Sequence, residues 1–254
     1  MHIPLHLPPL YLEGRIGLEA ARLRRSAIWI EARRLDGGGR PVLLVPGFLA
    51  GDAALQTMTR WLTTAGYRPE RAGMRSNVAC SEEACQRLSA RLETLADRAG
   101  EPVTLIGHSR GGMLARVLAV RHPDLVAGIV TLGSPVRSQL AVHPVVLAQV
   151  GLVAALGSSR VPGLFSWTCL RGTCCAAFRE DLAGPFPEEV GYVALYSRSD
   201  GVVDWRACLD PAAGRCAEVE SSHCGMAMSA AAYAEIAGAL AGFGGASEVG
   251  AVSH

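Results

Sequence analysis

The chain has 254 residues, of which 50% are hydrophobic and 19% are charged, and its formal net charge is +1. A chain of this length and apolarity can bury a large core in one domain, which excludes a disordered protein. The near-neutral charge and the lack of a basic patch with interleaved aromatic residues argue against nucleic acid as a partner.

A helical arm is predicted over about residues 10–35, because a glycine-rich breaker at 36–39 ends it. Its arginines alternate with apolar residues, as expected for the solvated basic face of a surface helix; they are Arg22, Arg24, Arg25, Arg33 and Arg34. The first residues lack the basic region, apolar run and cleavage site of a signal peptide. No uncharged apolar stretch reaches the ~18 residues of a membrane span. These observations favour a cytoplasmic protein with no integral membrane segment.

Strand-like and helix-like segments then alternate along the chain. Strands are predicted over residues 41–46, 67–74, 103–106, 125–132, 190–196 and 217–220. Helices are predicted over 53–65, 81–99, 110–120 and 229–240, with Ser81 as a candidate N-cap. Because the strands are continuously apolar, the fold class is α/β, with a mainly parallel sheet covered by helices on both faces. All of this is compatible with a single domain over residues 1–254.

The alternation breaks over about residues 136–189. This segment contains an apolar helix-like run over 142–156 and then a stretch rich in Pro, Gly and Cys. An insertion of this kind predicts a helical lid or cap over a site. An ordinary covering helix with a loop is the alternative.

The residues Gly107-His108-Ser109-Arg110-Gly111 match the G-x-S-x-G pattern of a nucleophile elbow. They lie between an apolar β-rich run and a helix, which is the expected setting. Glycine is needed where neighbouring backbone passes too close for a side chain, and the N-terminus of the following helix favours developing negative charge. The pattern predicts Ser109 as a nucleophile; the alternative is a glycine-rich turn before an ordinary helix.

A nucleophilic serine needs a base, and the base needs an orienting acid. His223 is the candidate base because it lies in a small polar loop after a predicted strand. Asp200 is the candidate acid, just past the end of another strand. Asp204 is the alternative, although it is better placed to cap the short helix that follows it. The other histidines after Ser109 are less suitable as the base. His122 is too close to Ser109 in the sequence, His143 lies in the insertion, and His254 lies in the tail.

Two backbone N–H groups are expected to stabilise an oxyanion. One belongs to Arg110, directly after the nucleophile, and the other to the loop after the first strand. In that loop Gly47 allows close approach of the backbone, and Phe48 is the expected donor. Leu49, one position further along the chain, is the alternative donor.

The eight cysteines are Cys80, Cys85, Cys169, Cys174, Cys175, Cys208, Cys216 and Cys224. The glycine-containing loop that carries Cys169, Cys174 and Cys175 suits a disulfide better than a core. Cys208 and Cys224 flank the candidate acid and histidine, where a disulfide would brace the site. A zinc site is a third interpretation of the cysteines, although the spacing matches no zinc-ligand template well; we expect no metal and no cofactor. The even number of cysteines is compatible with an exported form, and the compartment stays open.

Together these segments resemble the α/β-hydrolase superfamily, and more narrowly its bacterial esterase and lipase branch. The matching pieces lie at 46–49, 107–112, 132–135, 197–203 and 222–226, so the resemblance covers most of the chain. It implies an α/β-hydrolase fold with a cap between two strands. It also implies a triad and two oxyanion donors: Ser109, Asp200 and His223, with Phe48 and Arg110. The missing signal peptide and the high cysteine content depart from the family's secreted lipases.

The leading hypothesis is therefore a serine hydrolase that cleaves carboxylic esters, as an esterase or a lipase, through an acyl-enzyme. The apolar lid helix favours small-molecule or lipid esters with hydrophobic acyl or aromatic groups, and contact with a lipid interface. Two alternatives are an acyltransferase with the same triad and a non-catalytic α/β-hydrolase scaffold. The sequence predicts no oligomeric state.

Overall fold

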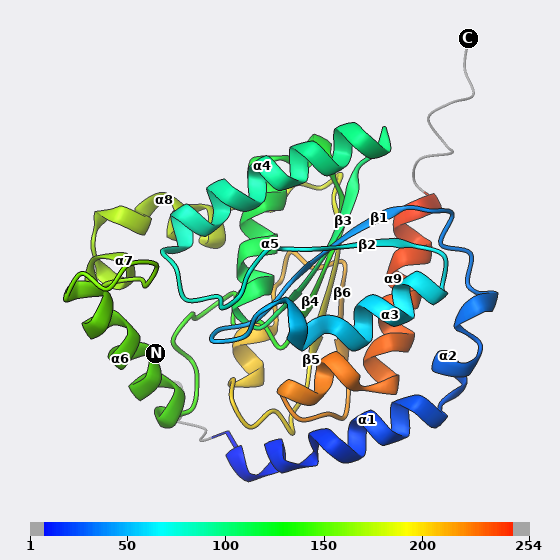
Figure 1. Cartoon of the computed structure of the whole chain (residues 1–254), viewed down its shortest axis with the longest axis horizontal. Helices are drawn as coiled ribbons and strands as arrows, with labels where there is room; N and C mark the ends of the chain where they lie inside the picture. The colour runs from blue at the N-terminus through cyan, green and yellow to red at the C-terminus, as the bar shows by residue number, and fades with distance from the viewer. Residues whose placement is uncertain (1–7, 246–254) are drawn as a thin grey trace.

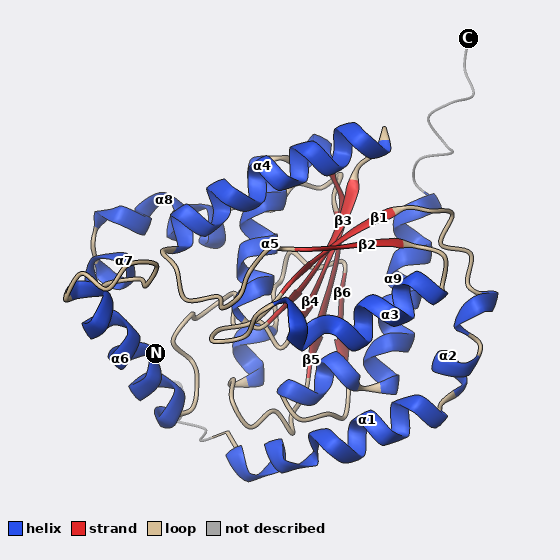
Figure 2. Cartoon of the chain, in the orientation of Figure 1, coloured by secondary structure: helices blue, strands red, loops and turns tan. Residues whose placement is uncertain are grey.

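The computed structural model describes residues 8–245, and its centre is one six-stranded sheet with the strand order β2-β1-β3-β4-β5-β6 (Figures 1 and 2). All neighbouring strands are parallel. The strands are β1 (Pro41–Val45), β2 (Arg68–Arg71), β3 (Val103–His108), β4 (Val126–Leu132), β5 (Gly191–Tyr196) and β6 (Arg215–Glu218). The predicted α/β class with a parallel sheet is confirmed. Because the strands are parallel, their carboxyl ends lie at one edge, where such sheets carry their sites.

Helices cover both faces of this sheet (Figure 2). One face packs on α4 (Ser81–Ala99), α5 (Arg110–Arg121) and α8 (Ala176–Ala183). The other face packs on α1 (Ile16–Arg25), α2 (Ala27–Ile30), α3 (Gln56–Thr64) and α9 (Ala230–Gly245). In β1, Leu43 points to the first face and Leu44 to the second, and both are buried. This two-sided burial explains why the strands are continuously apolar.

Short 3-10 helices fill several connections. They span Leu10–Arg15, Ala32–Arg34, Asp52–Leu55, Pro123–Leu125, Thr173–Cys175, Trp205–Cys208 and Cys224–Met228. The predicted N-terminal arm is thus divided into two α-helices flanked by 3-10 turns. On α1, Glu19 and Leu23 are buried while the arginines face solvent, so the basic face is solvated as expected.

The chain leaves the sheet between β4 and β5 and forms α6 (Pro144–Ser158), α7 (Trp167–Arg171) and α8. Figure 1 shows α6 and α7 beside the sheet, outside its two helical layers. Val153 and Ala154 of α6 pack with Val78 and Phe165 in a small separate core. We call residues 133–190 the cap segment; it spans the insertion predicted over 136–189.

Helix α4 begins at Ser81, and Cys80 is its N-cap. The prediction of Ser81 as N-cap is therefore wrong by one residue, because the Ser81 hydroxyl instead accepts a hydrogen bond from Arg110. Among the described helices none is both long and apolar enough to cross a membrane. Residues 1–7 and 246–254, which the predicted single domain includes, lie outside the described part.

Candidate active site

Ser109 lies at the sharp turn between β3 and α5, in a strained conformation. Its φ of 53° and ψ of −120° fall outside the regions that a serine ordinarily adopts. Its backbone N–H donates to the carbonyl oxygen of Leu132 over 2.8 Å, which helps to hold the turn. A Cβ at Gly111 would collide with the Val45 carbonyl, and one at Gly112 with the Ser134 hydroxyl. A Cβ at Gly107 would collide with the backbone of Gly112 at the start of α5, so both glycines of the motif are required by close packing around the turn.

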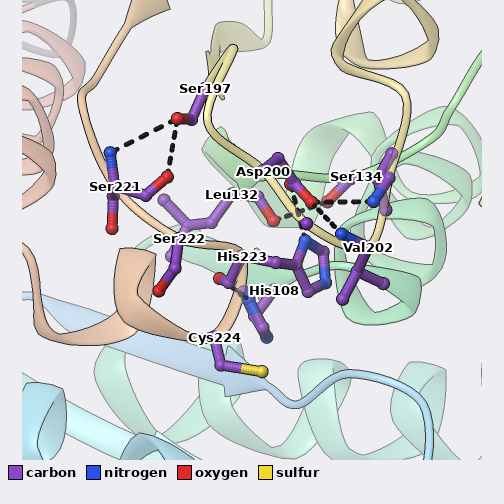
Figure 3. Close-up of polar contacts among 12 residues, drawn as sticks. His108, Leu132, Ser134, Ser197, Asp200, Val202, Ser221, Ser222, His223 and Cys224 are labelled. Carbon is purple, nitrogen blue, oxygen red and sulfur yellow. Dashed lines mark hydrogen bonds and ion pairs between the residues drawn. The ribbon is translucent and has the colours of Figure 1, made fainter. Parts of the chain in front are cut away.

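His223 and Asp200 form a buried hydrogen-bonded pair at the carboxyl edge of the sheet. His223 Nδ1 lies 2.7 Å from Asp200 Oδ2 (Figure 3). The other carboxylate oxygen of Asp200 accepts the backbone N–H groups of Val202 and Val203, over 2.8 and 2.7 Å. These bonds hold the carboxylate toward the imidazole, and the pairing leaves Nε2 as the nitrogen that can take a proton from a nucleophile.

Asp204, the alternative acid, has another contact. Its Oδ1 accepts the backbone N–H of Arg206 over 3.0 Å and so caps the 3-10 helix Trp205–Cys208. This is the capping role expected for it. The structure therefore brings Asp200, and not Asp204, to His223.

The loops that carry Asp200 and His223 are tied together through two serines. Ser197 Oγ donates to the Ser221 carbonyl over 2.6 Å and accepts the Ser221 N–H over 3.3 Å (Figure 3). Ser197 follows β5 and Ser221 follows β6, which are neighbouring strands. This buried link fixes the separation of the two loops, and thereby the separation of the acid and the imidazole.

Two histidines with opposite electrostatics lie next to each other. Burial lowers the pKa of His223, but the Asp200 carboxylate, by charge and hydrogen bond, and Glu13 raise it, and the net shift is upward. Burial and the neighbouring His223 lower the pKa of His108 to about 4. His108 is thus neutral at neutral pH. Its Nε2 lies 2.9 Å from the His223 carbonyl oxygen, to which it must donate.

Two glutamates of the N-terminal arm support the histidine loop, and neither was predicted from the sequence. Glu13 Oε1 accepts the backbone N–H groups of His223 and Gly201, and its Oε2 accepts that of Cys224. The buried Glu19 accepts from the backbone N–H and hydroxyl of Ser222, and from the hydroxyl of Ser221. The sequence contains only a weak indication that Glu19 is buried: it shares a helical face with the apolar Leu23.

The candidate oxyanion donors border the same cavity as Ser109. Arg110 is the first residue of α5, so its backbone N–H has no partner within the helix. Phe48 and Leu49 follow β1, and both line the cavity. Leu49 has a positive φ of 60°, so this loop is strained as the serine turn is.

The side chain of Arg110 joins this region to the loop before α4. It is buried and donates to the Asn77 carbonyl and side-chain oxygens, both over 2.8 Å, and to the Ala79 carbonyl over 2.7 Å. Asn77 in turn donates to the Pro46 carbonyl in the loop after β1. Burial lowers the pKa of Arg110 to about 10, which leaves it charged at neutral pH.

Ser109 and His223 line one cavity of about 460 Å³. This volume is in the range of small-molecule sites. The cap segment contributes mainly apolar walls, among them Val146 and Val150 of α6 and the nearby Phe165 and Leu170. The cavity therefore offers a polar end at the serine and an apolar remainder.

The three histidines less suited to act as the base lie elsewhere or outside the described residues. His122 contacts the Ser89 hydroxyl over 2.8 Å. His143 caps α6, because its Nδ1 accepts the Val145 N–H. His254 lies outside the described part.

The predicted disulfides are not formed, and all eight cysteines are free. Cys169 and Cys174 have the closest sulfur atoms, yet these are 3.2 Å apart, whereas a disulfide bond is about 2.0 Å long. Cys175 and Cys208 are buried. The expectation that the loop carrying Cys175 lies outside the core is therefore wrong for Cys175.

Comparison with known proteins supports the fold and a distant relationship. The α/β hydrolase fold family matches residues 97–155. A triacylglycerol lipase of Pseudarthrobacter phenanthrenivorans is 32% identical over 106 residues, which are 38% of this chain and 33% of the relative. One of Burkholderia plantarii is also 32% identical over 106 residues, 38% of this chain and 30% of the relative. The match thus spans about a third of the length of these curated relatives.

Solved structures give the same fold over most of the chain. The mature Bacillus licheniformis lipase superposes with a TM-score of 0.60 at 16% identity, covering 81% of this chain and 94% of the lipase. The monoglyceride lipase of Saccharomyces cerevisiae superposes with a TM-score of 0.60 at 13% identity, covering 82% and 89%. These similarities confirm the resemblance drawn from the motifs. The chain has the α/β-hydrolase fold, and its matched segment is distantly homologous to triacylglycerol lipases.

Proposed function

We propose that this protein is a serine hydrolase that cleaves carboxylic esters of hydrophobic acyl or aromatic groups. One observation carries the proposal: the strained Ser109 and His223, whose imidazole is paired with the buried Asp200, line the same, largely apolar cavity. Nucleophile, base and acid in one site are the set that acyl transfer requires. We also propose that the chain is one domain whose cap segment covers this site.

Acylation begins when Ser109 Oγ attacks the ester carbonyl carbon and His223 Nε2 takes the hydroxyl proton. The carbonyl oxygen becomes an oxyanion, which the backbone N–H groups of Phe48 and Arg110 stabilise. Asp200 keeps its negative charge and stabilises the imidazolium that forms. The carbon–oxygen ester bond then breaks, and the alcohol leaves with the proton from His223.

Deacylation repeats these steps with water. His223 takes a proton from the water, whose oxygen attacks the acyl carbon, and the same N–H groups hold the second oxyanion. The Ser109 ester bond breaks, Ser109 recovers its proton from His223, and the carboxylic acid is released.

The cap segment supports a hydrophobic substrate and contact with a lipid interface. Helix α6 turns Val146 and Val150 toward the cavity. Elsewhere on its surface α6 exposes further large apolar side chains, and α7 adds one more: Val145, Leu147, Leu152, Leu156 and Trp167. Exposed apolar side chains of this number are compatible with contact with an apolar partner. The matched relatives in Pseudarthrobacter and Burkholderia are named as triacylglycerol lipases.

Replacing Ser109 with alanine tests the chemistry. Ser109→Ala should lower kcat on p-nitrophenyl esters by at least about 10⁴-fold, because the nucleophile is lost. An organophosphonate should label the native protein at Ser109 and leave the variant unlabelled. Thr94→Ala on α4, which removes an exposed hydroxyl, is the control and should keep full activity. Unchanged turnover by Ser109→Ala would overturn the proposal, and failure of both turnover and labelling in the native protein would favour a non-catalytic scaffold.

A series of esters tests the substrate class. Activity should increase with acyl-chain length and increase further when triglycerides are presented at an oil–water interface. A preference for short soluble esters would instead identify an esterase without interfacial contact. Competing alcohol acceptors distinguish hydrolysis from acyl transfer, because an acyltransferase would form the new ester in place of the free acid.

A further inference from the structure

Four cysteines from distant parts of the chain converge at the base of the cap segment. Cys80 caps α4, Cys169 lies in α7, and Cys174 and Cys175 lie in the adjoining 3-10 helix Thr173–Cys175. Their four Sγ atoms all lie within 4.8 Å of one another. Cys174 Sγ lies 3.2 Å from that of Cys169, 3.5 Å from that of Cys80 and 3.6 Å from that of Cys175. Cys80 and Cys175 are separated by 3.3 Å.

We propose that these four cysteines bind one Zn²⁺ ion as a tetrahedral thiolate site. Zinc–sulfur bonds of about 2.3 Å in tetrahedral geometry place the sulfur atoms about 3.8 Å apart. Four of the six sulfur separations are 3.2–3.6 Å, so the cluster needs only a small expansion along them to hold the ion. As each zinc–sulfur bond forms, one thiol loses its proton to solvent, and no oxidant or reductant is involved.

The surroundings of the cluster suit a negatively charged zinc–thiolate complex. The Ser166 backbone N–H and hydroxyl both contact Cys169 Sγ, over 3.4 and 3.6 Å. Arg110 donates to the Ala79 carbonyl and the Ser81 hydroxyl, on either side of Cys80. Arg179 donates to the Cys169 carbonyl over 3.1 Å. Polar N–H donors and neighbouring cations of this kind orient and stabilise metal ligands.

Two disulfides are the competing state of the same four thiols. A disulfide bond needs only two sulfur atoms to approach each other. Two disulfides would therefore not require the two bonded pairs of cysteines to lie close together. Here Cys174 Sγ has three sulfur neighbours at similar distances. This mutual convergence favours a single central ion over two independent bonds.

A zinc ion at this position would fasten the cap segment to the body of the protein. Cys80 belongs to the loop before α4, whereas the other three ligands belong to the cap segment. Cys169 also lines the cavity that contains Ser109. The ion would therefore fix one end of the cap beside the candidate active site and leave α6 as its exposed part.

The first experiment measures metal in the whole protein, purified in reducing buffer with zinc supplied. Elemental analysis should find about one zinc per chain after dialysis, as in a structural site. Exchange with Co²⁺ should give the intense visible absorption of tetrahedral cobalt with thiolate ligands. Titration of the wild-type thiols with a mercurial should release that zinc. Zinc-free protein with four reactive thiols, or disulfides among these cysteines in the freshly isolated protein by mass spectrometry, would overturn the proposal.

Variants then assign the ligands. Cys174→Ser and Cys169→Ser should each lose the zinc on dialysis against a chelator and lose the cobalt spectrum. The matched control is Cys216→Ser, an exposed cysteine of β6 outside the cluster, which should retain both. Zinc should also raise the Tm of the wild type and of Cys216→Ser but not that of Cys174→Ser. Ser109→Ala should bind zinc normally, so this result does not depend on the proposed hydrolysis. Retention of zinc by both cluster variants would contradict the assignment.

Discussion

The carboxylate of Glu13 accepts a hydrogen bond from the backbone N–H of His223 over 2.7 Å, although the two residues are 210 positions apart. The same carboxylate accepts the N–H groups of Gly201 and Cys224 over 3.0 and 2.9 Å. The N-terminal arm thus braces both the loop of the candidate acid and the loop of the candidate base. It is part of the framework of the site and not only a cover for the sheet.

Glu13→Gln should change the pH dependence of the proposed activity. The Glu13 charge raises the pKa of His223, so its removal should move the acid limb of the kcat/KM profile to lower pH. The amide can replace only part of the hydrogen bonding, and unfolding free energy should fall by about 1 kcal/mol. Glu31→Gln, at the exposed far end of the arm, is the control and should leave the profile unchanged. An acid limb that does not move in Glu13→Gln would contradict this role.

The native pH profile should itself report His223. Because its pKa is raised above the ordinary value of 6.5, ester hydrolysis should fall as pH decreases through that raised pKa, where the imidazole becomes protonated and cannot accept a proton. His108, with a pKa of about 4, should remain neutral over the pH range in which His223 becomes protonated. Imidazole titration by NMR checks both assignments. A measured pKa of His223 below 6.5 would contradict this prediction.

Asp200→Asn should abolish most of the proposed activity. The amide cannot stabilise the imidazolium and favours the wrong tautomer of His223, so kcat should fall by about 10⁴-fold. Asp204→Asn, four residues away, should keep kcat within about threefold, because asparagine also caps the 3-10 helix. Steady-state kinetics on a p-nitrophenyl ester compare the two variants. If Asp204→Asn were the more damaging one, the assignment of the acid would be reversed.

Gly111→Ala should destabilise the turn that presents Ser109. The added Cβ would collide with the Val45 carbonyl oxygen, so the unfolding free energy should fall by about 2–3 kcal/mol and activity should fall with it. Gly17→Ala on the exposed side of α1 is the control: its Cβ meets open space, and helix propensity predicts a gain of up to about 1 kcal/mol. Chemical denaturation measures both. Equal effects in the two variants would exclude the proposed close packing.

The regular elements were largely predictable because their signals are local. The helix over 81–99 is the observed α4, and the predicted strand over 41–46 is β1 with one residue fewer. The weaker edge strands were less accurate: β2 covers Arg68–Arg71 within the predicted 67–74, and β6 begins two residues earlier than predicted. Edge strands are half covered and have no continuous apolar run, so their bounds depend on pairing that the local pattern does not contain.

The sequence by itself determined the α/β class, the elbow at 107–111 and the order of serine, aspartate and histidine, because periodicity, glycine spacing and chain order are local properties. Only the tertiary structure decided that Asp200 contacts His223 while Asp204 caps a helix, since both lie in the same short loop. It also decided the roles of Glu13 and Glu19 and the convergence of Cys80 with the cap cysteines. These contacts join segments tens to hundreds of residues apart, and their distances follow from how the arm, the cap and the sheet pack together.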